Sequence, residues 1–222
     1  MLVNLAMTAD GKIATANRAV STFGSPRDHE HLLELRSTAD VVMAGAATVN
    51  AAPVNLGPGA PKFQRRRQRH GLAEFNLRVI VSGSGSVNPG AEIFRHRFSP
   101  IIILTTARIS KAKLRQLRAL ADEVKICGRT QINFRTALRW LREKWKVNRL
   151  LCEGGGELNE ALFRAGLVDE IHLTICPKIF GGRLAPTIAD GRGFEKLRQA
   201  GKFQLRSARN LKGELFTVFS RA

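Results

Sequence analysis

Residues 150–165 constrain the fold of this chain more than any other stretch. Three apolar residues lead into Glu153, three consecutive glycines follow, and apolar residues then recur at Leu158, Ala161 and Leu162. That spacing places them on one face of a helix. Gly166 stands where the helix would need a left-handed cap. We therefore predict a buried strand, a glycine turn and a helix, in that order.

The glycine turn is also a candidate binding site for an anion. Glycine lets the backbone approach a ligand closely, and the first turn of a helix offers unpaired N–H groups and the positive end of the helix dipole. The spacing is not G-x-G-x-x-G, so it does not support a standard Rossmann fingerprint. From the residues alone, a phosphate or dinucleotide site and an ordinary strand-to-helix turn both remain open.

Short apolar runs elsewhere predict further strands, with helices between them. The runs are rich in Val and Ile and too short for helices, which is typical of buried parallel strands. Ser25, Pro26 and Asp28 fit the N-cap, the first turn and the capping box of a helix. Residues 111–121 and 134–145 predict two more helices. The strand runs are residues 2–6, 41–44, 79–81, 101–104, 124–126 and 150–152.

The end of the chain has a different pattern. Residues 170–176 alternate between apolar and polar, and residues 203–209 and 214–220 flank a Lys212-Gly213 turn, which predicts a closing antiparallel hairpin. The predicted fold class is therefore α/β, with a mixed, mostly parallel sheet flanked by helices. We find no break in composition and no internal repeat, and we predict a single domain over residues 1–222.

The formal net charge of +18 is the strongest anomaly of composition. It is compatible with nucleic-acid binding, with anionic substrates, or with adaptation to an unusual cell interior. The densest basic run, residues 62–70, follows a stretch rich in Gly and Pro, and we interpret it as a mobile surface loop. Contact with RNA or DNA is the less favoured role for that run, although the charge leaves it open.

Other features argue for a cytoplasmic protein without a metal site. No apolar run approaches the roughly 18 residues that would suggest a membrane span. The first residues read as a strand, not as a signal peptide. Cys127, Cys152 and Cys176 lie far apart and form no C-x-x-C pair, which favours reduced thiols. The motifs of a zinc deaminase are absent.

Polar residues cluster at the ends of the predicted strands, where open α/β sheets bind ligands. Asp10 and Lys12 form a charged turn after the first strand, and Ser82 follows the third. Arg36 shares a helix side with apolar residues, so its charge requires an acid or an anion unless it reaches the solvent. Thr48 follows a strand, a glycine and small residues. Each feature alone also fits an ordinary turn or packing site.

Taken in order, these motifs resemble a known family. They are D-G-K-I-A, S-P-R-D before a helix ending in L-R, A-G-A-A-T, E-G-G-G, G-L-V-D-E and K-I-F-G-G. Over nearly the whole chain the order is similar to the reductase domain of bacterial riboflavin biosynthesis and its stand-alone archaeal relatives. The resemblance implies a dihydrofolate reductase-like fold without a deaminase domain, and a homodimer. It also implies NADPH-dependent reduction of 5-amino-6-(5-phosphoribosylamino)uracil to the ribitylamino product.

The resemblance also implies roles for individual residues. Lys12 and Glu153 correspond to catalytic positions beside the reacting sugar. Arg36 corresponds to a position on the substrate side, facing a phosphorylated small molecule, and Asp10 belongs to the Lys12 turn on that side. The positions that correspond to cofactor binding are Thr48, Ser82, Gly154, Gly155, Gly156, Glu157 and Leu158.

The chain also departs from the family pattern at the binding site. Family members usually follow the threonine with an acidic residue, whereas residues 51–56 here carry none. The usual polar-aromatic pair before the first helix is missing, and Thr22 and Phe23 stand nearby. Two alternatives to the riboflavin reaction therefore remain. One is an NADPH-binding relative with a different small carbonyl or imine substrate, and the other is a basic nucleic-acid-binding protein on this scaffold.

Overall fold

The computed structural model describes residues 1–18 and 23–222, so Thr22 lies outside the described part. The chain forms two compact units. Unit 1 contains residues 1–32 and 152–222, and unit 2 contains residues 33–151. Within the described residues, no helix combines the length and apolar character needed to cross a membrane.

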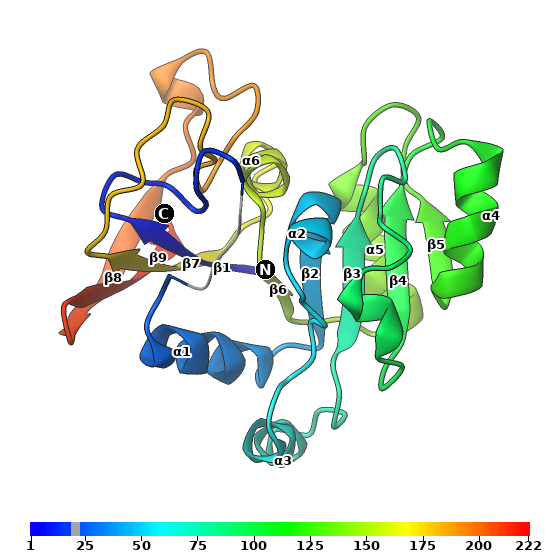
Figure 1. The fold of residues 1–222 in the computed structure, drawn as a ribbon, viewed down its shortest axis with the longest axis horizontal. Helices are drawn as coiled ribbons and strands as arrows, with labels where there is room; N and C mark the ends of the chain where they lie inside the picture. Colours follow the sequence, from blue (N-terminus) through cyan, green and yellow to red (C-terminus); the bar gives the residue numbers. More distant parts are fainter. Residues whose placement is uncertain (19–22) are drawn as a thin grey trace. The chain divides into compact units, whose positions relative to one another are not determined.

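Unit 1 is built on four strands that lie side by side in Figure 1. β1 (Leu2–Thr8) pairs in parallel with β7 (Glu170–Cys176). β7 pairs antiparallel with β9 (Glu214–Arg221), and β9 pairs antiparallel with β8 (Phe203–Leu211). Lys212 and Gly213 join the last two strands with positive φ angles of 55° and 87°, as a two-residue hairpin requires. The predicted hairpin is confirmed.

Unit 2 contains a parallel run of strands. β2 (Val41–Gly45), β3 (Leu77–Val81), β4 (Ile101–Thr105) and β5 (Glu123–Ile126) pair in that order. Every residue of β4 is buried, which explains its continuous apolar sequence. β6 (Leu150–Cys152) crosses the boundary between the units. The predicted mixed, mostly parallel sheet is confirmed.

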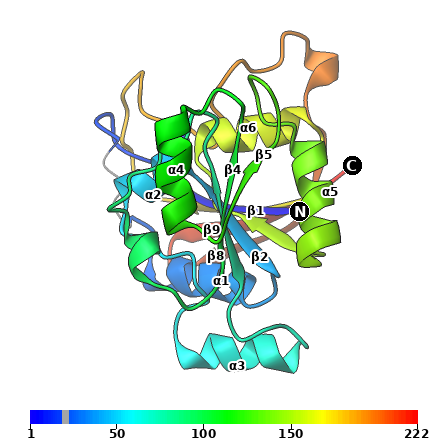
Figure 2. The same cartoon turned by 90° about the vertical axis from the view of Figure 1, so that its right-hand side faces the viewer.

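The longer helices begin at side-chain caps. Ser110 Oγ accepts the N–H of Lys113 at the start of α4 (Lys111–Leu120), and Asn133 Oδ1 accepts that of Thr136 at the start of α5 (Phe134–Trp145). Figure 2 shows these two helices on opposite faces of the unit 2 strands. The remaining elements are α2 (Ala46–Ala51), α6 (Gly156–Arg164) and the 3-10 turns η1 (Glu92–Arg95) and η2 (Leu197–Gln199).

The start of the first helix is confirmed, and it has an additional partner. α1 (Pro26–Arg36) begins at the proline, and Ser25 Oγ accepts the N–H of Asp28 (3.3 Å). The Ser25 N–H donates to Glu214 Oε1 (2.8 Å), and its hydroxyl donates to the other oxygen of that carboxylate (2.5 Å). The capping serine therefore also ties α1 to β9.

The interpretation of residues 62–70 as a loop is wrong, because they lie mostly within α3 (Pro61–Arg69). Pro61 occupies the first turn, where its missing N–H costs nothing. Lys, Gln and Arg are good helix formers, so a run of them favours a helix even without an apolar stripe. Phe63 and Arg67 lie one turn apart and are both buried. The flanking glycines and prolines obscured this pattern.

Arg67 holds α3 against the end of α1. Its side chain is only 1% exposed. Its Nη1 donates to the carbonyl oxygens of Arg36 (2.7 Å) and Ala39 (2.5 Å), and its Nε donates to that of Ala73 (2.8 Å). The last carbonyls of a helix lack helical partners and carry partial negative charge, so a cation is favoured there. Burial lowers the pKa of Arg67, and the charge of Asp40 opposes that shift.

We expect Arg67→Met to lower the free energy of unfolding by about 2–4 kcal/mol, because it removes charged donors from buried carbonyl oxygens. Arg66, the half-buried neighbour of Arg67, provides the control. Arg66→Met should change the free energy of unfolding by less than about 0.5 kcal/mol. Urea unfolding followed by circular dichroism would measure both. Equal midpoints for the two variants would show that Arg67 does not anchor the helix.

Candidate active site

A tight turn after β1 presents Lys12. The N–H of Thr8 donates to Lys12 O (2.8 Å), and the N–H of Gly11 donates to Thr8 O (2.9 Å). The Lys12 N–H donates to Thr8 Oγ1 (3.0 Å). Gly11 has a φ of +80°, a conformation that glycine adopts without strain. The backbone of the turn is therefore closed by its own hydrogen bonds, and the position of Lys12 is fixed.

Asp10, in the same turn, holds the loop that follows β7. Its carboxylate accepts the N–H groups of Phe180 (3.2 Å) and Gly181 (2.7 Å), and also the hydroxyl of Thr8. The hydroxyl makes the largest contribution to lowering the pKa of Asp10, and the two N–H groups add to it. The observed contacts of Asp10 are thus with the protein itself. Its predicted contact with a substrate stays a prediction.

Lys12 contacts a segment that is distant in the sequence and for which the sequence patterns predicted no role. We call residues 185–190 the strap. Lys12 Nζ donates to Ala185 O (3.2 Å), and the N–H of Ile13 donates to Pro186 O (2.9 Å). Lys12 and Thr187 also form an antiparallel β-bridge. Side chain and backbone together fix Lys12 against the strap.

The glycine turn packs against β1 and against the same strap. Gly154 has a φ of +81°, and a Cβ there would lie 3.1 Å from Leu5 Cδ2. The peptide bond between Gly154 and Gly155 is cis. A Cβ on Gly156 would lie 2.5 Å from both Thr187 O and Asp190 Oδ2. Position 156 therefore accepts a side chain only if the strap moves.

Hydrogen bonds tie the strap to α6. The N–H of Asp190 donates to Gly156 O (3.0 Å), and Asn159 Nδ2 donates to Ile188 O (2.9 Å). Cys152 Sγ donates to Asn159 Oδ1 (3.5 Å), so the strand before the turn joins the same network. The strap thus connects the Lys12 turn to the first turn of α6.

Two of the predicted residues of unit 1, Lys12 and Gly156, contact the strap. Glu153 is half-buried and follows β6 directly. Gly154 and Leu158 are buried, whereas Glu157 is exposed. An acidic side chain in the first turn of a helix is favoured by the dipole. The strap thus contacts both a cation, Lys12, and a glycine turn at a helix N-terminus.

The predicted residues of unit 2 lie on different loops. Arg36 is buried at 7% exposure, and its Nη1 donates to Gly57 O (2.6 Å). Asn55 Oδ1 accepts the N–H of Gly57 (2.9 Å). One N–H of the guanidinium thus braces the loop that departs from the family pattern. Thr48 is half-buried in α2.

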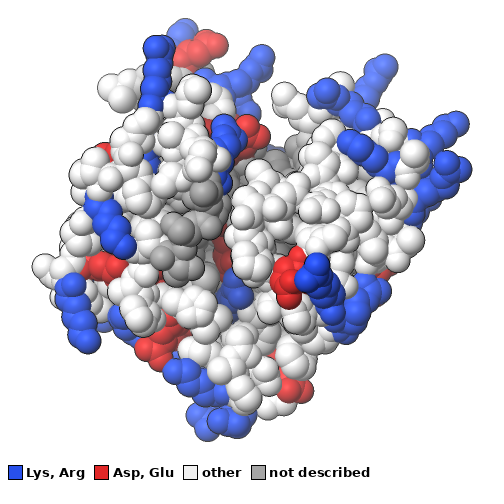
Figure 3. Space-filling view, in the orientation of Figure 1, with Lys and Arg blue, Asp and Glu red and all other residues white. Residues whose placement is uncertain are grey.

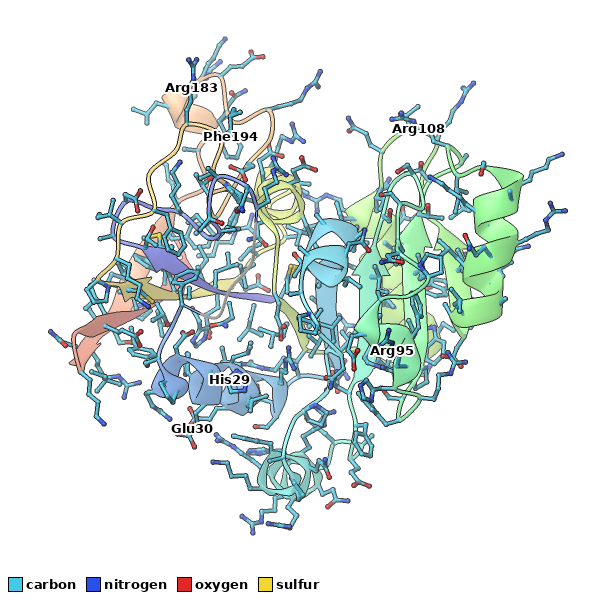
Figure 4. All side chains as sticks on the ribbon, in the orientation of Figure 1. His29, Glu30, Arg95, Arg108, Arg183 and Phe194 are labelled. Carbon is cyan, nitrogen blue, oxygen red and sulfur yellow. The ribbon has the colours of Figure 1, made fainter. Side chains whose placement is uncertain are left out.

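Ser82 organises the turn after β3. Its N–H donates to Leu104 O (3.0 Å), and its Oγ accepts the N–H of Ser86 (2.9 Å). The next turn, after β4, is bonded to it, because Thr106 Oγ1 donates to Gly83 O (2.6 Å) and accepts the N–H of Arg108 (3.2 Å). Figure 4 shows Arg108 beyond the ends of the unit 2 strands. Hydroxyls and one cation therefore share this sheet edge.

The missing acid after Thr48 leaves an asparagine that links α2 to the loop after β3. Asn50 Nδ2 donates to Ser86 O (2.8 Å), and Asn50 Oδ1 accepts the N–H of Asn88 (2.8 Å). The amide can serve as donor and acceptor at once, which a carboxylate cannot do. Where this chain departs from the family pattern, two hydrogen bonds of Asn50 therefore join α2 to the turn that Ser82 begins.

The strap was missed because nothing in its sequence predicts its partners. Its residues lack periodicity, and a run containing Pro186, Asp190 and Gly191 reads only as a turn. The contact of Thr187 with Gly156 joins positions that no local pattern relates. The sequence signal for this segment was its density of turn-forming residues, which indicates a loop but not the partners of that loop.

Comparison with known proteins agrees with this architecture. The sequence model of the family described as RibD C-terminal domain matches residues 1–216. A reductase of 2,5-diamino-6-ribosylamino-4(3H)-pyrimidinone 5′-phosphate from Methanothermobacter thermautotrophicus is 30% identical over 99% of this chain and 97% of its own. The Archaeoglobus fulgidus protein of the same name is 32% identical over 88% of each chain.

Solved structures show the same fold. A pyrimidine reductase-like protein from Corynebacterium diphtheriae has a TM-score of 0.78 at 22% identity, covering 100% of this chain and 91% of its own. The riboflavin biosynthesis reductase Rib7 of yeast has a TM-score of 0.69 at 15% identity, with 100% and 89% covered. The fold class, the motifs and the match over residues 1–216 agree, and the chain belongs to the RibD C-terminal domain family of riboflavin-biosynthesis reductases.

Proposed function

We propose that this protein uses NADPH to reduce the ribosyl group of a phosphoribosylamino-pyrimidine to a ribityl group. The observation that carries the proposal is the strap, which connects a fixed lysine to a glycine turn at a helix N-terminus. Reductases named for such a substrate match nearly the whole chain. We further propose that residues 1–222 act as one reductase domain, because the family match spans both units.

NADPH, when bound, supplies a hydride to C1′ of the sugar, and the protein contributes positioning and electrostatics. In the proposed reaction the bond from C1′ to the ring oxygen breaks, a C1′–H bond forms, and the ring oxygen takes a proton. Lys12 stabilises the negative charge that develops on that oxygen, because its ammonium group is a fixed cation. Glu153 is the proposed group for proton transfer at the same place.

The remaining roles follow from donor chemistry. The first turn of α6 offers N–H groups that suit a cofactor phosphate. For Thr48 and Ser82 of unit 2, we propose that their hydroxyls bind phosphate or ribose oxygens. Arg36 is proposed to hold the substrate phosphate, since a guanidinium is a cation whose N–H groups match the geometry of phosphate oxygens. For Asp10 we propose a positioning role, because its oxygens accept from Thr8, Phe180 and Gly181.

Two pyrimidines are candidate substrates, the 2,5-diamino-pyrimidinone and the deaminated uracil. The relatives that match this chain end to end are named for the diamino compound. A RibD protein from Actinobacillus pleuropneumoniae matches over only 53% of its length, at 26% identity. We therefore propose the diamino compound first, and parallel assays with both would decide. Turnover of neither would instead favour another small carbonyl or imine substrate.

The location and assembly are also proposals. Cys127, Cys152 and Cys176 are buried free thiols, which supports a reducing cytoplasm.

Burial raises the pKa of Cys152 to about 12, and the charge of Glu153 adds to that rise. This thiol is therefore not a nucleophile at neutral pH. The family resemblance supports a homodimer.

We expect Lys12→Met and Glu153→Gln each to lower kcat/KM by about 100-fold or more, because both changes remove interactions made in the transition state. The dissociation constant for NADPH, measured by nicotinamide fluorescence, should change less than about threefold. Glu195→Gln and Lys212→Met remove exposed charges of the same unit and serve as controls. A parallel loss of NADPH affinity and turnover would contradict the catalytic assignment.

The preference for NADPH over NADH is expected to depend on Arg108. A 2′-phosphate carries about two negative charges, and losing one charged hydrogen bond costs roughly 1.5–3 kcal/mol. Arg108→Ala should therefore weaken NADPH binding by about 10- to 100-fold and leave NADH binding nearly unchanged. Arg95→Ala, also in unit 2 and labelled in Figure 4, is the control. Equal effects on the two nucleotides would exclude Arg108 from phosphate recognition.

A further inference from the structure

The positive charge of this protein is concentrated in one of its two units. Unit 2 contains 22 Lys and Arg residues against 7 Asp and Glu, a formal net charge of +15. Unit 1 contains 14 against 11, a net charge of +3. An adaptation of the whole protein to its surroundings would raise the charge of both units. A difference this large instead indicates an anionic partner for unit 2.

The charge of unit 2 exceeds what a dinucleotide needs. A single NADPH carries about four negative charges on its phosphates. The basic residues are also far more numerous than those at the sheet edge near Ser82 and Arg108. A partner that matches the excess must present many phosphates or carboxylates at once.

The densest cations stand on α3, in a stretch of the sequence without acidic residues. No Asp or Glu occurs between residues 41 and 73. Lys62, Arg65, Arg66 and Arg69 follow the i, i+3, i+4 and i+7 spacing of one helix side. Lys62, Arg65 and Arg69 are exposed. The helix thus presents a row of cations about one turn apart.

The opposite side of α3 fixes this row in position. Phe63 and Arg67 are 4% and 1% exposed, and the guanidinium of Arg67 is bonded to three carbonyl oxygens. A cation row on an anchored helix loses little backbone entropy when a partner binds. The same anchoring leaves α3 no apolar side chain to insert into a lipid surface. These observations disfavour a membrane as the partner.

Two more helices of unit 2 repeat the pattern. α4 carries Lys111, Arg115 and Arg118, all exposed, at i, i+4 and i+7. α5 carries Arg135, Arg139 and Arg142 at the same spacing, also exposed. In Figure 3, Lys and Arg side chains stand out from the part of unit 2 that carries α4. Regular rows of this kind suit a polyanion with a repeating charge.

We propose that unit 2 binds the phosphate backbone of nucleic acid, with α3 as the principal contact surface. The row on α3 offers phosphate contacts only, because its one aromatic residue, Phe63, is buried and cannot stack on a base. Binding is therefore independent of base sequence and depends steeply on salt. This activity is additional to the proposed reductase function and does not depend on it.

The test measures the fluorescence anisotropy of a labelled 20-base-pair duplex with the full chain at several NaCl concentrations. About four phosphate contacts predict a slope of log K against log salt between roughly −3 and −4. Affinity should then fall about 100-fold from 50 to 200 mM NaCl. No binding at 50 mM, or a flat salt dependence, would overturn the proposal.

Charge variants locate the surface. The double variant Arg65→Glu/Arg69→Glu should weaken binding at least 30-fold, and Arg65→Gln/Arg69→Gln should reduce the salt slope by about 2. Arg209→Glu/Lys212→Glu makes the same charge change on exposed residues of unit 1 and should weaken binding less than threefold. NADPH fluorescence and circular dichroism verify folding. Equal losses in the two charge-reversed variants, or preferential binding to phosphatidylserine vesicles, would refute the α3 surface.

Discussion

The contact between the strap and Gly156 is the constraint on which the candidate site of unit 1 depends. A Cβ at position 156 would collide with Thr187 O and Asp190 Oδ2, so the strap can close on α6 only where glycine stands. The same strap accepts Lys12 Nζ and the N–H of Ile13. One segment thus sets the position of a cation and of a helix N-terminus together. The proposed reaction, with an anionic cofactor and Lys12 as a charged catalytic group, needs that kind of coupling.

Two glycines of this turn have a packing role. Gly156 lies against the strap, and Gly154 lies against Leu5 of β1. Asn159 extends the network to the strand before the turn and to Ile188. The turn, the strap and the Lys12 loop are therefore mutually dependent. Relatives that match over most of their length are named as reductases.

Local patterns predicted most of the fold because burial and capping leave clear traces in sequence. β7 and α5 match their predicted bounds, and Gly166 has the predicted left-handed φ of +63°. α3 was not predicted, because its inward face consists of one Phe and one buried Arg, which no hydrophobic pattern includes. The predicted site residues Lys12 and Gly156 both contact the strap, but no pattern in the sequence predicted a role for the strap. Contacts such as Thr187 with Gly156 join distant positions through packing, and single-sequence patterns do not record them.

The most direct test of the proposed reduction is isotope transfer from NADPH deuterated at C4 of the nicotinamide. The full chain would be incubated with the diamino-pyrimidine ribosylamine phosphate, and the product would be analysed by mass spectrometry and NMR. The proposed reaction predicts one deuterium at C1′ of the ribityl group from one face of the cofactor, and loss of this transfer in Lys12→Met. Product without deuterium at C1′, or oxidation of NADPH with no change in the sugar, would contradict it.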